Sequence, residues 1–402
     1  MNSPDTRTKL YLDPNLRVVF AVTLMAIMGV ANITPAFPRI ARELGVTPKQ
    51  IAYLITYFTV PGVFLAPILG VLADRIGRKR ILAPSLFLFG LAGTACGFVR
   101  DFDLLLGLRF LQGVGAAALG ALNVTIIGDL YSGRERTAAM GYNSSVLSVG
   151  TAAYPLLGGA LATIGWYYPF LVSIAAIPVG FLVFFGLKSP EPRNKQRLRA
   201  YFGDVWHIVR KRSIIGLFLG ALVTFVVLYG SYLTFLPFLI AQSFHGTPLL
   251  IGLIMSCASI STALTSTQLG WFAKRCSEKR LLAAGYVLFA LSMAIVPFVP
   301  SLWVLLVPAV IQGAAMAFTM PNISSLMAAF APVNQRGAIM SLNGMVLRLG
   351  QTLGPIIMSG VFAARGFPGV YFAGSLFALG MSVVAVIMIE QPKEQEGRSP
   401  SS

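Results

Sequence analysis

Long apolar segments separated by short polar turns make up almost the whole chain. Twelve of them approach or exceed the roughly 20 residues with which an α-helix crosses the hydrocarbon core of a bilayer. Backbone polar groups in lipid must be bonded within the protein, which favours helices. We therefore predict an all-α polytopic membrane protein with twelve transmembrane helices. These spans lie near residues 16–38, 49–72, 81–99, 102–129, 137–163, 166–187, 214–242, 249–272, 281–298, 301–329, 337–363 and 367–389.

The composition supports this interpretation. Of 402 residues, 56% are hydrophobic and 11% are charged, whereas a soluble domain has about a quarter charged residues. A net charge of +17 would suggest nucleic-acid binding in a soluble protein. In a multi-span protein it reports topology, because Lys and Arg accumulate on the cytoplasmic side. We therefore expect the lipid bilayer, and no nucleic acid, as a partner.

The basic residues are unequally divided between the two sets of loops. The termini and the loops after even-numbered spans carry 24 of them, and Arg109 and Arg348 lie inside spans. The opposite loops carry only Arg39, Arg42, Lys49, Arg100 and Arg365. This asymmetry predicts a multi-pass protein of the plasma (inner) membrane with both termini cytoplasmic.

An internal repeat divides the spans into six and six. A shift of 200 positions without gaps superposes Gly70 on Gly270, Arg75 on Arg275, Gln112 on Gln312, Asn143 on Asn343, Gly150 on Gly350 and Pro155 on Pro355. Such a repeat predicts two parallel halves about an axis normal to the membrane. We expect an N-terminal six-helix bundle (1–187), a basic linker (188–212) and a C-terminal six-helix bundle (213–402), with a cavity between the bundles.

The linker leaves two interpretations open. Its apolar residues recur with helical spacing at Tyr201, Phe202, Val205, Trp206 and Val209. With its eight basic residues, it could form an amphipathic helix on the anionic inner leaflet. A solvated linker fits the sequence equally well.

The turn between the second and third spans has the most distinctive local sequence in the first half. Residues 70–82 read GVLADRIGRKRIL, of the form G-x-L-A-D-R-x-G-R-K-R. A generic basic loop would supply the arginines, but not an acid flanked by glycines at this spacing. The stretch closely resembles the signature loop of the major facilitator superfamily of transporters, and the resemblance extends over the full chain. It implies the major facilitator fold, with two pseudo-symmetric six-helix bundles.

The resemblance also implies that this loop is a conformational latch. Asp74 is expected to pair with Arg78, or with the positive N-terminus of span eleven in the outward-facing state. Asp129, at the end of span four, resembles the acidic partner of this network. The second copy has Lys274 in place of the acid, which predicts an asymmetric latch. The predicted latch residues are Gly70, Asp74, Arg75, Gly77, Arg78 and Asp129.

Span four has the pattern R-x-x-Q-G-x-G at residues 109–115. An Arg inside a span must face protein or water. Resemblance to the family's second signature implies that Arg109, with Gln112, takes part in proton transfer. An Arg109 that bonds backbone carbonyls or snorkels outward is the structural alternative.

Span five has the pattern G-x-x-x-Y-P-x-x-G-G, which resembles the family's antiporter signature except for Tyr154 in place of a glycine. Span eleven has G-x-x-x-G-P at residues 350–355. Gly and Pro permit close packing and a kink in a helix that rocks. The resemblance implies export, and glycines that serve packing alone are the alternative. The predicted hinge residues are Gly150, Pro155, Gly158, Gly159, Gly354 and Pro355.

Arg348 lies about ten residues, or roughly 15 Å, inside span eleven. Near mid-membrane, an ionisable residue suggests function. Arg348 could bind an anionic substrate or act as a fixed counter-charge, and pairing with carbonyls or Asn343 is the alternative. The other candidates for the substrate cavity are Asn32, Tyr229, Tyr232, Gln312 and Asn343.

No Asp or Glu lies in the middle of a predicted span, and span one has Asn32 where many drug/proton antiporters of this type have a carboxylate. A cationic substrate is therefore not favoured. Neutral or anionic amphiphiles fit better, and no proton path is defined.

We expect a secondary active transporter that exports small amphipathic compounds by alternating access. The expected driving force is a proton gradient, with no cofactor and no metal site, and the expected state is a monomer. The alternative is an exporter or exchanger of a polar or anionic metabolite, such as a sugar or a siderophore-like compound, anchored by Arg348. A membrane enzyme would need a cluster of His, Asp or Cys at one face, and His207 and His245 fall on opposite sides of the predicted topology. A channel is disfavoured because no re-entrant filter or ring of charges is evident.

Overall fold

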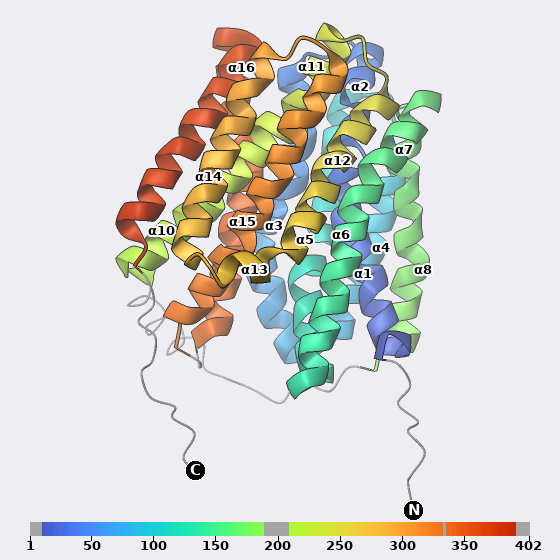
Figure 1. The fold of residues 1–402 in the computed structure, drawn as a ribbon. Helices are drawn as coiled ribbons and strands as arrows, with labels where there is room; N and C mark the ends of the chain where they lie inside the picture. The colour runs from blue at the N-terminus through green and yellow to red at the C-terminus, as the bar shows by residue number, and fades with distance from the viewer. Residues whose placement is uncertain (1–9, 189–208, 333–334, 391–402) are drawn as a thin grey trace, which may run out of the picture.

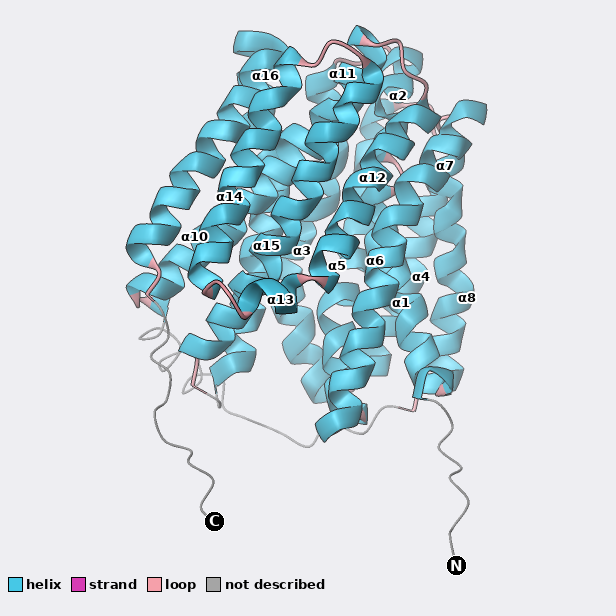
Figure 2. Ribbon diagram, in the orientation of Figure 1, coloured by secondary structure: helices cyan, strands magenta, loops and turns pink. Residues whose placement is uncertain are grey.

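The computed structural model describes residues 10–188, 209–332 and 335–390, and nearly all of them are helical (Figure 1). The predicted helix at 201–209 lies almost wholly outside the described residues. In the described part of the chain, short loops join the helices and there is no strand (Figure 2). The prediction of an all-α fold is confirmed.

Each half contributes six membrane-spanning units. In the first half they are α1 with α2 (Pro14–Ala31 and Phe37–Leu44), α3 (Pro48–Ile76), α4 (Arg78–Ala95), α5 (Phe102–Leu130), α6 (Gly133–Ile164), and a unit of α7, η3, α8 and η4 (Tyr168–Leu171, Val172–Ala175, Ala176–Phe181 and Leu182–Gly186). In the second half they are α10 with η5 and α11 (Arg212–Val226, Val227–Phe235 and Leu236–Ser243), α12 with α13 (Pro248–Thr267 and Leu269–Ala273), α14 (Glu278–Ile295), α15 (Leu306–Phe330), and the two parts of α16 (Arg336–Met388).

The twelve spans are recovered once two helices are considered individually. Ten of the described helices are long and apolar enough to cross a membrane. The eleventh span is α4, whose first turn contains three basic residues that lower its hydropathy. The twelfth arises because α16 runs through 53 residues with a break at Gly366, where φ is 62° and the backbone is not helical. A left-handed φ favours glycine, so Gly366 separates spans eleven and twelve.

The repeat in the sequence produces the same helix start in each half. Thr47 and Thr247 are the N-caps of α3 and α12, and each side chain accepts a hydrogen bond from the backbone N–H three residues on. Pro48 and Pro248 follow at the first helical position, where the missing N–H is not needed. Residues 200 positions apart therefore place the second span of each half in the same way.

Each half packs around a hydrophobic core of its own. One core consists of residues between Leu16 and Leu187 together with Phe238, and the other of residues between Ile214 and Ile389. The first described residues and the end of α16 lie at the lower side in Figure 1, which we call the terminal face. α2 and α11 lie at the opposite side, which we call the far face.

The two halves meet along two helix pairs, α6 with α12 and α3 with α16. At the far face α11 also contacts α2. Toward the terminal face the helices of the second half spread away from those of the first (Figure 1). On α6 and α12 polar side chains at that level, such as Ser144, Ser145, Thr267 and Gln268, are exposed. The halves are therefore closed against each other at the far face.

Candidate functional site

The centre of the molecule, between the halves, contains Arg348. Its side chain crosses from α16 to α3, where a Cβ added to Gly62 would come within 3.2 Å of Arg348 Cδ. Gly120 of α5 faces Nη2 of the same guanidinium. Glycine at these two positions leaves room for an Arg side chain between the halves, because neither has a Cβ.

Among the described residues, the guanidinium of Arg348 has polar neighbours but no acidic one. Its Nη1 donates to Gln351 Oε1 at 3.1 Å, one helical turn further along α16. Tyr229 of η5 lies close enough to interact electrostatically with the charge, and its ring is tilted against that of Phe225 with 5.7 Å between the ring centres. None of the ion pairs among the described residues involves Arg348. An unpaired cation beside aromatic rings can bind an anionic amphiphile.

A pair of threonines links the halves beside Arg348. The hydroxyls of Thr59 on α3 and Thr352 on α16 share a hydrogen bond of 2.9 Å. Thr352 also bonds the Arg348 carbonyl oxygen, and Thr56 donates to the Thr352 carbonyl oxygen at 3.4 Å. These weak polar contacts close the interface just beyond the guanidinium and can break without exposing a charge.

The remaining cavity candidates lie within the halves. Tyr232, Gln312 and Asn343 are buried in the second half, and each has a side-chain oxygen atom without a hydrogen-bond partner among the described residues. Asn32 is buried in the first half, where its amide donates to the Pro169 carbonyl oxygen at 2.7 Å. The structure thus brings Tyr229 to Arg348 and packs these four side chains inside a bundle.

Arg109 is wholly buried in the first half. It donates to the Leu54 carbonyl oxygen and to Gln112 Oε1 at 3.1 and 2.6 Å, and its guanidinium lies 4.3 Å from the ring centre of Phe58. Gln112 in turn donates to Ser173. These contacts correspond to the structural alternative, in which carbonyls and an aromatic face hold the charge.

The loop between α3 and α4 gathers a charge network at the terminal face. Arg78 lies 3.1 Å from Asp74 and also forms an ion pair with Asp129 at the end of α5. Gly77 separates the helices with a φ of 103°, which a side chain would strain. The Asp74 side chain is 57% exposed, so in this state it pairs with Arg78 within its own half. Gly70 has open space around it, and Arg75 is exposed.

The glycines of α6 serve two different interfaces. Gly158 packs against the backbone of Asn32 inside the first half, whereas Gly159 packs across the interface against the Pro248 carbonyl oxygen of α12. Gly252 of α12 packs reciprocally against the Pro155 carbonyl oxygen. A Cβ at Gly159 or Gly252 would collide with backbone atoms. We call this reciprocal contact the far-face seam.

The glycines one repeat apart have equivalent contacts. Gly150 of α6 packs against Leu24 and Ile27 of α1, and Gly350 of α16 packs against Leu222 of α10. Gly354 packs against Val226 and Gly230 in the same unit. These glycines thus let the fifth span of each half approach the first span of the same half. Tyr154 and Pro155 are buried beside the far-face seam.

Sequence reasoning missed Gln351, Thr352, Thr59 and Gly252. Gln351 follows Arg348 by three residues, a spacing that places two side chains on one helix face, and this signal could have identified it. Thr59 and Gly252 become significant only through contacts across the halves, for which the sequence offers no local signal.

Two bundles of six spans with a charged, polar centre between them define a polytopic membrane transporter. The family model "Major Facilitator Superfamily" matches residues 19–245 and 221–402, and the chain belongs to this family. It is therefore a transporter and not an enzyme. Among solved structures, it is similar to a D-xylose-proton symporter, with a TM-score of 0.78 and 13% identity over 95% of this chain and 99% of that one.

Curated relatives of similar length include an exporter and a multidrug resistance protein. The chain is 26% identical to "Bacillibactin exporter" of Bacillus subtilis (strain 168), over 95% of this chain and 98% of the relative. It is 27% identical to "Multidrug resistance protein 2" of the same organism, over 92% of this chain and 95% of the relative. The chain is an efflux-type transporter of this superfamily that handles small molecules.

Proposed function

We propose that the protein exports small amphipathic compounds by alternating access in exchange for protons. The observation that supports this most directly is Arg348, a cation with no ion-pair partner in the described part of the chain, which lies near Tyr229 between two halves that are closed at one face. Compounds with an apolar ring system and an anionic group fit this site. The names of the relatives, which include a multidrug and a bacillibactin exporter, agree with such a range.

The second candidate is an exporter or exchanger of a polar or anionic metabolite. It is favoured by the absence of any acidic partner of Arg348 among the described residues, because a small anion could then neutralise the guanidinium by itself. Aromatic rings beside the charge favour an amphipathic compound over a fully polar one.

In this proposal the terminal face is cytoplasmic and the membrane is the plasma (inner) membrane, since basic residues concentrate in the loops of that face. The structure then corresponds to the state that accepts substrate from the cytoplasm. Residues 1–187 and 213–402 rock as two units about the centre of the molecule, so that the far-face seam opens when the terminal face closes. Each monomer contains a complete site.

The functional test is accumulation in inside-out vesicles from cells that lack their own efflux pumps. A panel of fluorescent anionic, neutral and cationic amphiphiles is offered, with polar anions in parallel. We expect a proton gradient (acid inside) to drive uptake of anionic and neutral amphiphiles, and an ionophore that collapses the gradient to abolish it. Uptake that the ionophore does not change would contradict proton antiport, and uptake of polar anions alone would favour the second candidate.

The charge network of Asp74, Arg78 and Asp129 is proposed to latch the opposite state. In the present state Asp74 is exposed and pairs with Arg78, so it is free to meet span eleven when the terminal face closes. A coupling of this kind contributes about 1–3 kcal/mol.

Asp74→Asn is therefore expected to slow export about tenfold, because the state closed at the terminal face loses a charged contact. Export rates and protein levels are measured together. Glu135→Gln is the matched control, since it neutralises another exposed acid at the terminal face. Equal rates in Asp74→Asn, Glu135→Gln and the wild type would remove the latch from the mechanism.

A further inference from the structure

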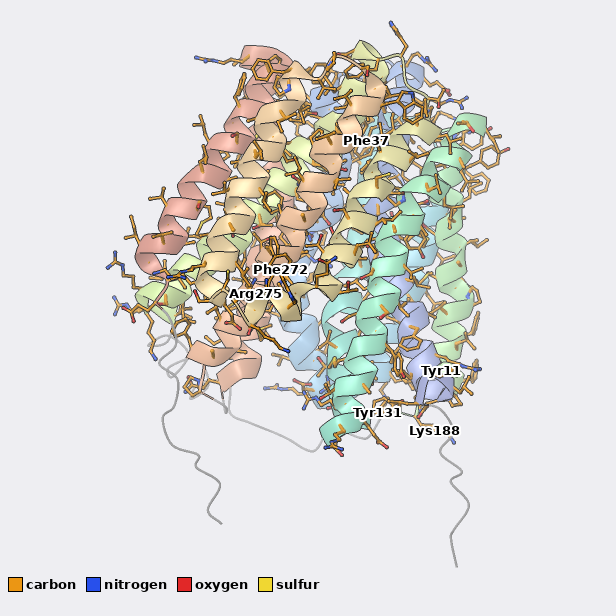
Figure 3. All side chains as sticks on the ribbon, in the orientation of Figure 1. Tyr11, Phe37, Tyr131, Lys188, Phe272 and Arg275 are labelled. Atoms are coloured by element: carbon orange, nitrogen blue, oxygen red, sulfur yellow. The ribbon has the colours of Figure 1, made fainter. Side chains whose placement is uncertain are left out.

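A cavity lies at the far face, away from Arg348. It has a volume of about 680 Å³, within the range of small-molecule sites. Its walls come from both halves: α2 and the end of α6 on one side, α11 and the start of α12 on the other. Figure 1 shows α2 and α11 at this face, and Figure 3 labels Phe37 of α2 in the upper part of the molecule. Its lining includes Arg39, Arg42, Thr163, Phe238, Gln242 and Ile251.

The cavity combines apolar walls with a cationic rim. Arg39 is engaged, because it donates to Glu43 and to the carbonyl oxygens of Ala162 and Thr163 at 2.6, 2.7 and 2.8 Å. Arg42 is exposed, and within the described part of the chain its guanidinium has no ion-pair partner. With Arg39 neutralised by Glu43, the lining has a net positive charge from Arg42. Phe238, Ile251 and Pro248 provide an apolar surface beside it.

The position of these charges is unusual for the topology. The sequence has five basic residues on this side, and three of them fall between Arg39 and Lys49. Basic residues are depleted on the side opposite the cytoplasm. Two of these three, Arg39 and Arg42, line the cavity, which favours an anionic ligand over a cationic one.

The cavity depends on the conformational state. Its two walls belong to different halves, and the far-face seam of Gly159 and Gly252 holds them together. When the far face opens, a ligand in the cavity loses one wall. A ligand that binds one state better than the other shifts the population toward the first state.

We propose that this cavity binds a small amphipathic organic anion from the far side, and that its occupancy holds the far face closed and slows export. Binding of the anion goes beyond the proposed function. Slowing of export rests on the proposed function, because it requires alternating access.

Binding is tested with 2-naphthalenesulfonate and the full-length protein in nanodiscs of neutral phosphatidylcholine. Arg348→Ala is the background, so that the central cation does not contribute. We expect saturable binding that weakens about tenfold on Arg42→Glu, because the charge reversal repels the sulfonate. Arg365→Glu, the matched control, reverses an exposed cation of the same face outside the cavity and should leave binding unchanged. The uncharged 2-naphthol should bind equally in all three proteins.

Absent binding, or an equal affinity in Arg42→Glu and Arg365→Glu, would overturn the site. The effect on export is measured in right-side-out vesicles that contain the wild-type Arg348. External 2-naphthalenesulfonate should slow efflux of a neutral fluorescent amphiphile severalfold, and Arg42→Glu should relieve the inhibition. Binding without inhibition would overturn the role in gating. Absence of efflux before the sulfonate is added would instead count against the proposed function, and the nanodisc result would still decide the site.

Discussion

Arg348→Ala is expected to reduce export of anionic amphiphiles to near background while neutral amphiphiles are still exported. The guanidinium lies at the centre of the molecule between the halves, and hydrogen bonds to a charged group contribute about 1.5–3 kcal/mol each. Loss of one or two such bonds weakens anion binding at least about tenfold. Export of matched anionic and neutral compounds in vesicles measures the effect.

Thermal stability separates this role from a structural one. Arg348 has no acidic partner among the described residues, so its removal leaves no unpaired charge behind. The thermal midpoint should therefore stay the same or rise. Arg365→Ala, which removes an exposed Arg at the far-face end of the same span, is the matched control. A lower midpoint together with unchanged export of anions would assign Arg348 to packing.

Gly252→Val is expected to block the transport cycle by preventing closure of the far face. A Cβ at this position would collide with the Pro155 carbonyl oxygen, so α12 must move away from α6. Overpacking of this kind costs about 1–3 kcal/mol. Each 1.4 kcal/mol lowers the population of the state closed at the far face about tenfold. Export should fall about tenfold or more, with the protein still folded and inserted.

Gly360→Val is the matched control for this substitution. Gly360 lies in a membrane helix with open space around it, so the same side chain meets no neighbour there. It should retain nearly normal export. Similar export by Gly252→Val and Gly360→Val would mean that the far-face seam does not need to close.

Much of the fold could be predicted from the sequence because lipid restricts the possibilities. Apolar length defined the spans, and the offset of 200 residues implied equivalent elements in the two halves. The N-caps of α3 and α12, Thr47 and Thr247, agree with this offset. The boundaries were less certain. α6 begins at Gly133, four residues before the predicted start, because polar residues extend the helix beyond the apolar core.

The arrangement of side chains was harder to predict, because the spans are apolar on all sides. Without a polar face, the sequence does not separate the side that meets lipid from the side that meets protein. Tyr229 and Tyr232 show the consequence. Both were cavity candidates three residues apart, but Tyr229 lies beside Arg348 and Tyr232 packs inside the second half.

The depth of the charged residues could be predicted from the sequence, but only some of their partners could. The depth of Arg109 and Arg348 identified both as notable, since charges inside spans are rare. Arg109 lies over the aromatic ring of Phe58, and Arg348 donates to the amide oxygen of Gln351. Tertiary packing and side-chain rotamers determine these contacts, so the sequence did not reveal them. For Asp74 the sequence left two partners open, and the structure has Arg78 in that place.

The central claim is that the two faces open in alternation. Figure 3 shows Arg275 near α13 at the terminal side of the second half, and the neighbouring Lys274 is exposed. Spin labels at Arg134→Cys and Lys274→Cys report the terminal face, and labels at Ile164→Cys and Ser243→Cys report the far face, in a protein without its three native cysteines. A change of pH or addition of an exported amphiphile should shorten the distance between the two labels at the terminal face. In the same fraction of molecules it should lengthen the distance between the two labels at the far face. Two distances that stay fixed, or that change in the same direction, would contradict alternating access.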